Sequence, residues 1–257
     1  QVTEIRADDL RFTAVEVNEF LINVMELQLS DEESRALEIR TEGWITGLQL
    51  AAISLRGQKE PRKFIDRFSG NNRMVLDYLI NEVVTQQTDE IRSFLLKTSI
   101  LDRMSGPLCN AVTEEENGQK ILELLEHSNL FIIPLDNKRL WYRYHHLFAD
   151  LLRQMLHRTA KDELNSLHQK AGEWFTRNGF PDQAIEHFFK AEDYHRAVHL
   201  IEEQADDCWK RGEHSKLQYW LDTLPEELLL SKPNLCVFQA WEQYANGQQD
   251  AAEAILQ

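Results

Sequence analysis

The sequence predicts a mainly α-helical protein with a helical domain, a winged helix with a small β-hairpin, and an α-solenoid of tetratricopeptide-like helix pairs. Apolar residues recur at helical spacing along most of the 257 residues, with only 10 Gly and 6 Pro to interrupt them. Two short apolar runs at 130–135 and 140–144 form the one hairpin pattern. Three turn glycines near the C-terminus, spaced 33 and 35 residues apart, indicate a repeat.

The first part of the chain is predicted to be a set of short helices. Residues 1–12 suggest a strand that ends near Ile5 and then a polar turn. Thr13 and Glu16 have capping-box spacing, which predicts a helix through about Leu27. A second helix begins at Ser30, with three acidic residues in its first turn, and ends near Gly43. Further helices are expected at residues 44–55, 61–68 and 74–84, with a loop at residues 70–72.

The order of elements in residues 88–157 is that of a winged helix. Helical patterns at 88–96, 107–112 and 119–127 precede the two apolar runs, and a further helix is expected at 147–156. The third helix, where a DNA-reading helix would lie, carries Lys120 against Glu123 and Glu126. Residues 88–157 hold eight basic and ten acidic side chains, so we expect no direct DNA contact from this chain.

From about residue 160 the pattern is helical and periodic. The turns at Gly179, Gly212 and Gly247 each follow a helix that carries an aromatic residue, and each precedes a second amphipathic helix. A helix pair of about 34 residues is the length of a tetratricopeptide repeat, although the full consensus is missing. We expect the side chains of Trp174, Phe188 and Trp220 to be mostly buried. We also expect no β-strand after residue 160. Such arrays usually bind proteins or small effectors on their concave face.

Composition excludes several classes of protein. With 28 Lys and Arg against 43 Asp and Glu, the formal charge is −15, which opposes a general nucleic-acid surface. Cys109, Cys208 and Cys236 are far apart and form no CxxC motif, so buried thiols in a reducing compartment are expected. No run of 18 apolar residues and no signal-peptide pattern occurs, which predicts a cytoplasmic protein without a membrane partner.

No self-contained catalytic site can be read in the sequence. The phosphate-binding G-x-x-x-x-G-K-[S/T] loop is missing. We therefore expect that this chain is not an enzyme and does not bind ATP tightly by itself. The HExxH, GxSxG and EF-hand patterns are missing as well. His195 and His199 have zinc-compatible spacing, but no third ligand is near, and no metal is predicted.

The stretch Trp141–Arg153 is the sharpest local feature, because a hairpin strand passes directly into a helix with His145 and His146 at the junction. A helix N-terminus offers free N–H groups and a positive dipole end, which suit an anion such as phosphate. Arg143 lies two residues before His145, on the same side of a strand. The alternative is that the histidines only cap the helix or pack. We expect His145 within one residue of the helix start, with its ring available to an anion.

Two motifs then suggest a family. EGWITGLQLAA at residues 42–52, YRYHHLFADLLR at residues 142–153 and the helical array resemble the large ATP-binding LuxR-type, maltose-regulon-activator-like transcription regulators of the STAND class of signal-transduction ATPases. The opening EIRADDLRFT at residues 4–13 resembles the end of their nucleotide-binding core. The resemblance covers essentially the whole chain. The two central motifs together are fairly specific.

The resemblance implies a middle fragment with four parts. Residues 1–13 would end the nucleotide-binding core, 14–86 form the helical domain, 87–157 the winged helix, and 158–257 the start of the effector-binding solenoid. In related proteins a Gly-x-Pro motif packs on the adenine, and its positions here are Gly43, Trp44 and Ile45, with Ile45 in place of Pro. A winged-helix histidine of the family contacts the ADP β-phosphate, and its match here is His145.

The function implied is regulatory. The chain would be part of an ATP-dependent transcription activator in which nucleotide state, ADP-closed or ATP-open, and an inducer control self-association and DNA binding. The parent protein would be a slow ATPase that uses ATP or ADP with Mg. Its partners would be its own P-loop core, its C-terminal DNA-binding domain and an effector on the solenoid. The alternative is a free-standing helical interaction scaffold without a nucleotide link. A P-loop encoded upstream would favour the first, and a start codon near Gln1 the second.

Overall fold

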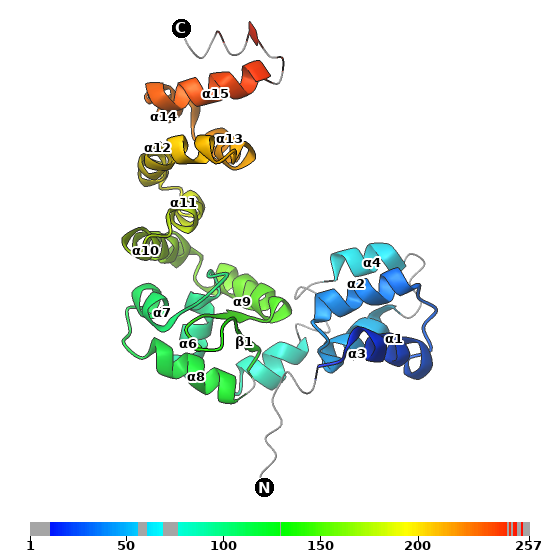
Figure 1. The fold of residues 1–257 in the computed structure, drawn as a ribbon. Helices are drawn as coiled ribbons and strands as arrows, with labels where there is room; N and C mark the ends of the chain where they lie inside the picture. The colour runs from blue at the N-terminus through cyan, green and yellow to red at the C-terminus, as the bar shows by residue number, and fades with distance from the viewer. Residues whose placement is uncertain are drawn as a thin grey trace. The chain divides into compact units, whose positions relative to one another are not determined.

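The computed structural model describes residues 11–55, 61–68, 77–128, 130–245, 247, 249–250 and 253. The chain divides into two compact units, Gln1–Lys161 and Asp162–Gln257. The predicted fold class is confirmed, because the described residues are mainly helical and their sheet consists of two short strands (Figure 1). The strand predicted near Ile5 and the loop predicted at residues 70–72 lie outside the described residues. None of the described helices has the length and apolar character needed to span a membrane.

The first unit begins with four short α-helices. Both predicted N-termini are confirmed, since Thr13 with Glu16 and Ser30 with Glu33 form complete capping boxes. The bounds of these helices are α1 Ala14–Glu19, α2 Asp31–Thr41, α3 Ile45–Leu55 and α4 Pro61–Arg67. Helix α2 contacts the other three, and their shared core includes Val17, Leu37 and Leu48.

The first predicted helix was too long. After α1 the backbone widens into the π-helical turn η2 (Phe20–Val24), in which the N–H of Met25 donates to the carbonyl of Phe20. Glu26 then has a positive φ of 56°, which ends the helix before Leu27. A second π-helical segment, η3 (Leu79–Val84), lies within the helix predicted at residues 74–84. Its earlier residues, up to 76, lie outside the described part.

The winged helix follows in the same unit. Its order is α6 Asp89–Thr98, α7 Gly106–Thr113, α8 Gly118–His127, β1 Ile132–Pro134, β2 Tyr142–Tyr144 and α9 His146–Thr159 (Figure 1). The predicted hairpin is confirmed and is antiparallel, although both strands are shorter than the apolar runs. In its register Ile133 lies opposite Arg143. Asp136 accepts hydrogen bonds from the N–H groups of Lys138, Leu140 and Trp141, and this turn ends the pairing early.

The second unit is a solenoid of antiparallel helices. The short 3₁₀ turn η4 Lys161–Glu163 begins at the last residue of the first unit. The helices of the second unit are α10 Leu164–Arg177, α11 Pro181–Lys190, α12 Tyr194–Lys210, α13 His214–Thr223, α14 Glu226–Leu230 and α15 Pro233–Ala245. Gly179, Gly212 and Gly247 have positive φ angles at the turns, as the repeat predicted. The described residues after 160 contain no strand. The short helix α14 was not predicted, and most of the helix expected at residues 251–256 lies outside the described residues.

The three aromatic residues of the solenoid follow the prediction. Phe188 is 3% exposed and Trp220 is 1% exposed. Trp174 is less completely buried than these two, and it stacks on Phe180 in the turn, at 6.2 Å between ring centroids. It lies in the last turn of α10, where a residue has fewer neighbours than in the middle of a helix.

Candidate functional site

Two segments far apart in the sequence meet in the first unit. The turn between α2 and α3 contacts the junction between β2 and α9, which brings residues 41–45 beside residues 142–146. These are the two places at which the sequence suggested ligand-binding residues. The site therefore joins the helical segment to the winged helix.

Glu42 is the centre of this contact. Its carboxylate accepts two hydrogen bonds from the Arg143 guanidinium, at 2.8 and 2.9 Å. It also accepts from Nδ1 of His146 at 2.6 Å and from the backbone N–H of His146 at 3.4 Å. Burial alone would raise the pKa of Glu42, but the hydrogen bonds from His146 and Arg143 outweigh it and lower the pKa below its usual value. Glu42 is therefore ionised at neutral pH.

His145 is the N-cap residue of α9 and is 4% exposed. Its Nε2 lies 2.8 Å from the Thr41 carbonyl oxygen, and a carbonyl only accepts, so Nε2 carries the proton. Burial lowers the pKa of His145 to about 4, so the ring is neutral at pH 7 and Nδ1 has a free lone pair. Nδ1 is buried and has no hydrogen-bond partner among the residues that the structure describes.

The residues of the predicted Gly-x-Pro-like motif lie beside this histidine. The Trp44 ring is 6.0 Å from the His145 ring and 4.8 Å from the Phe131 ring, both edge to face. Gly43 has a φ of 70°, and a Cβ built on it would lie 2.4 Å from the Phe12 carbonyl oxygen. Only glycine fits there, because both the backbone angle and the space exclude a side chain. Ile45 is the half-buried first residue of α3.

In this structure the two predicted binding residues of the junction contact other protein groups. The His145 ring is buried beside Trp44 and Phe131. The Arg143 guanidinium holds the Glu42 carboxylate. Arg143 and His145 both contact the turn between α2 and α3, at Glu42 and Thr41 respectively. This agrees with the expectation that their side chains point to the same side. Glu42 itself was missed, since its partners are more than 100 residues away and no local pattern marks them.

The metal question concerns the same cluster. Glu42, His145 and His146 each offer a ligand atom within 4.8 Å of the others, the one such group found in the described part of the chain. Arg143 binds both oxygens of that carboxylate, and its positive charge opposes a cation beside them. We assign no metal to the cluster. His195 and His199 lie on α12, where His199 faces Glu203 at 3.3 Å.

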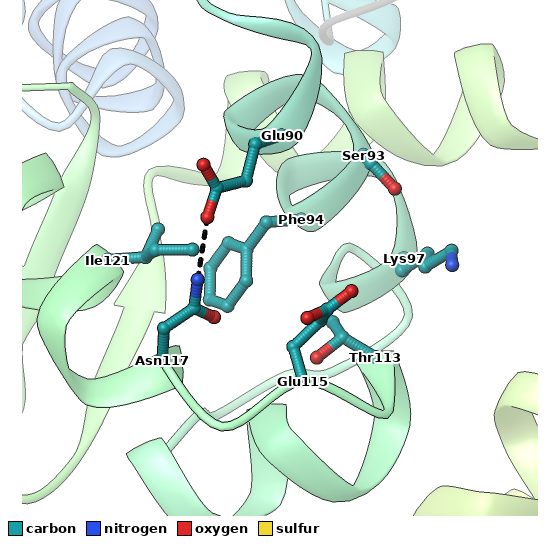
Figure 2. Close-up of a pocket in the computed structure, with 8 residues that line it drawn as sticks. All are labelled: Glu90, Ser93, Phe94, Lys97, Thr113, Glu115, Asn117 and Ile121. Carbon is teal, nitrogen blue, oxygen red and sulfur yellow. Dashed lines mark hydrogen bonds between the residues drawn. The ribbon is translucent and has the colours of Figure 1, made fainter.

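A separate pocket of about 270 Å³ lies between α6 and the turn before α8. The Asn117 side-chain amide donates a hydrogen bond to the Glu90 carboxylate at 2.6 Å. Figure 2 shows this hydrogen bond on one side of the pocket, with the Phe94 ring near the centre. Two carboxylates and one ammonium group are among its lining residues, so no single charge dominates it. None of the predicted binding residues lines it; those that do are Glu90, Ser93, Phe94, Lys97, Thr113, Glu115, Asn117 and Ile121.

Comparison with known proteins gives consistent results. Residues 80–164 match the family described as the MalT winged helix domain. The chain is 35% identical over 243 residues to the HTH-type transcriptional regulator MalT of Yersinia pestis, which covers 94% of the chain and 27% of that protein. It is 32% identical over 241 residues to the serine/threonine-protein kinase PknK of Mycobacterium tuberculosis, covering 94% of the chain and 22% of the kinase. The chain thus spans about a quarter of the length of these relatives.

Proposed function

The chain belongs to the MalT-like proteins, with a MalT winged helix domain at residues 80–164, and on this premise we propose that it is the regulatory segment of a STAND-class transcription regulator. The segment would couple the nucleotide state of the protein, ADP-closed or ATP-open, and the binding of an inducer to self-association and DNA binding. The contacts with nucleotide would be shared with a P-loop core. The solenoid would carry the effector surface.

The similarity to both MalT and PknK supports an input role. These relatives are named for two different outputs, a transcriptional regulator and a protein kinase. A segment of similar sequence in both is more consistent with sensing than with either output. A regulatory segment of a kinase is therefore the second candidate, and both candidates place the same function in this chain.

The observation that carries the proposal is the position of His145. His145 is the N-cap residue of α9, and its ring lies next to that of Trp44. The Nδ1 atom of this ring is buried and has no hydrogen-bond partner among the described residues. A nucleotide phosphate at this point would favour the protonated ring, which could then donate from Nδ1 while Nε2 still donates to Thr41. Gly43, Trp44 and Ile45 would contact the base. We infer that His145 is the phosphate contact of the ADP state.

The test uses the intact protein with its other domains. His145→Ala should weaken ADP relative to ATP by roughly 10- to 150-fold, since a hydrogen bond to a charged group is worth about 1.5–3 kcal/mol. Isothermal titration with each nucleotide measures this. The variant should also shift toward the active form without inducer, because a ligand shifts a switch only by its differential affinity.

The matched control is His157→Ala, on the exposed side of the same helix α9. It should leave both nucleotide affinities at their wild-type values. An unchanged ADP affinity in folded His145→Ala protein would contradict the phosphate-contact role and leave His145 as a packing residue.

A further inference from the structure

The winged helix contains an anion site that the chain fills with its own carboxylate. Three groups of this domain point at Glu42: the Arg143 guanidinium, the His146 imidazole and the backbone N–H of His146. That N–H belongs to the first residue of α9, a helix of 14 residues whose N-terminus carries a partial positive charge. The donors come from one domain and the carboxylate from another, more than 100 residues away.

The same donors suit a phosphate. Arginine binds a carboxylate or a phosphate through the same pair of parallel N–H groups, and helix N-termini bind both kinds of anion. The buried Nδ1 of His145 has no partner among the described residues, in a ring stacked 4.9 Å from that of His146. It accepts in the neutral ring, but a phosphate beside it would favour the protonated ring, whose Nδ1–H donates. The site therefore has capacity for an anion with more oxygen atoms than a carboxylate has.

We propose that Glu42 is an internal competitor for phosphate: in the ligand-free chain its carboxylate fills the anion site of Arg143 and His146, and a bound phosphate group takes these donors from it. This rests on the proposed function only in identifying the phosphate as that of a nucleotide. Displacing Glu42 would also break its ion pair with Arg143 and its hydrogen bonds from His146, and would leave the His145–Thr41 hydrogen bond as a polar contact between these segments. Binding of the anion is thereby linked to the packing of the helical segment on the winged helix.

The experiment uses the 257-residue chain and pyrophosphate as the probe, without Mg and with ionic strength held constant by NaCl. Glu42→Gln removes the negative charge and keeps the shape of the side chain. In the absence of probe it should unfold at a lower temperature than wild type. Pyrophosphate should bind it at least about tenfold more tightly than wild type, measured by titration calorimetry and by the rise in its unfolding temperature.

Two further variants decide where the probe binds. Glu116→Gln makes the same change of charge at an exposed position of the same unit, and its pyrophosphate affinity should equal that of wild type. Glu42→Gln combined with Arg143→Gln should lose the gain. If Glu42→Gln binds no more tightly than wild type, or if the gain persists in the double variant, the competition does not exist.

Should Glu42→Gln fail to fold, Glu42→Asp provides the test. It keeps the charge but shortens the reach to Arg143, so an intermediate gain in affinity is expected, and no gain overturns the proposal. The outcome is independent of His145→Ala in the intact protein. A gain for Glu42→Gln together with an unchanged ADP affinity in His145→Ala would retain the competitor and reject the nucleotide contact, and the reverse pair of results would do the opposite.

Discussion

At the turn between α2 and α3, two neighbouring residues are constrained in different ways. Glu42 has a φ of 49° and is held there by its hydrogen bonds to Arg143 and His146. Gly43 follows with a φ of 70°, and its carbonyl accepts a hydrogen bond from the Phe12 N–H at 3.0 Å. Two consecutive left-handed residues reverse the chain sharply, which is what brings Glu42 to α9. The backbone of Gly43 thus determines the position of the Glu42 carboxylate.

Gly43→Ala should destabilise the first unit by more than the left-handed conformation alone costs. That conformation costs an alanine about 1–2 kcal/mol. The Cβ would also lie 2.4 Å from the Phe12 carbonyl oxygen, a backbone atom that cannot move alone. Gly179→Ala is the comparison, because its φ is 77° and nothing lies within 4 Å of the added Cβ. Equal losses in unfolding free energy for the two variants would contradict this account.

At the scale of elements, the pair α10–α11 shows how helices of the solenoid are joined. Gly172 on α10 allows the Phe188 ring of α11 to approach, since a Cβ there would lie 2.7 Å from that ring. Beside it, His168 and His187 are both buried, with 2.8 Å between their Nδ1 atoms. One imidazole must donate and the other accept, so the pair is stable only with at least one neutral ring.

This pair makes the stability of the second unit depend on pH. Burial, and then the charges of His168 and Lys190, lower the pKa of His187 to about 3. Below about pH 6.5 the unfolded chain therefore binds a proton that the folded chain does not, and stability falls as pH falls toward 3. The slope for one such group is up to about 1.4 kcal/mol per pH unit.

The double variant His168→Leu/His187→Phe should show a smaller loss of unfolding free energy between pH 7 and pH 5 than wild type. Part of the dependence measured on the whole chain should remain, because His145 in the first unit also has a pKa lowered to about 4. Denaturant unfolding at the two pH values measures the difference. His195→Gln, at an exposed position on α12, should behave as wild type. Full pH dependence in the double variant would mean that other groups cause it.

At the scale of the whole molecule, the negative charge of the chain distinguishes this winged helix from one that binds DNA. The chain carries a formal charge of −15, and α8, which occupies the position of the reading helix, is acidic. Near the hairpin tip, Arg139 forms an ion pair with Glu126 of α8 at 2.8 Å. This pair lowers the net positive charge of the basic hairpin tip. Binding to duplex DNA depends on cations that displace counterions from phosphate.

We therefore expect the chain to bind random duplex DNA no more tightly than micromolar, even at low salt, where electrostatic binding is strongest. A gel-shift titration measures this. Replacing Glu123 and Glu126 with Gln should increase any residual binding, because it removes two negative charges from α8, one of them beside Arg139. Sub-micromolar binding by the wild-type chain would show that the charge argument fails.

How much of the structure could be read from the sequence depends on the range of the interactions. The helix starts at Thr13 and Ser30, the hairpin and the turns at Gly179 and Gly212 follow from residues within a few positions of one another, and these predictions were correct. The π-helical turn after α1 was not predicted, because it depends on packing around the element rather than on its own pattern.

The sequence by itself determined the fold class, the order of the segments and the two stretches that form the candidate site. Only the tertiary structure decided how those stretches meet. It placed Arg143 on Glu42 rather than toward a ligand, and it buried His145 with one nitrogen on the Thr41 carbonyl. These pairings join residues more than 100 positions apart, and a charged side chain carries no local signal of which opposite charge it will meet. Its partner is fixed only when the helices have packed.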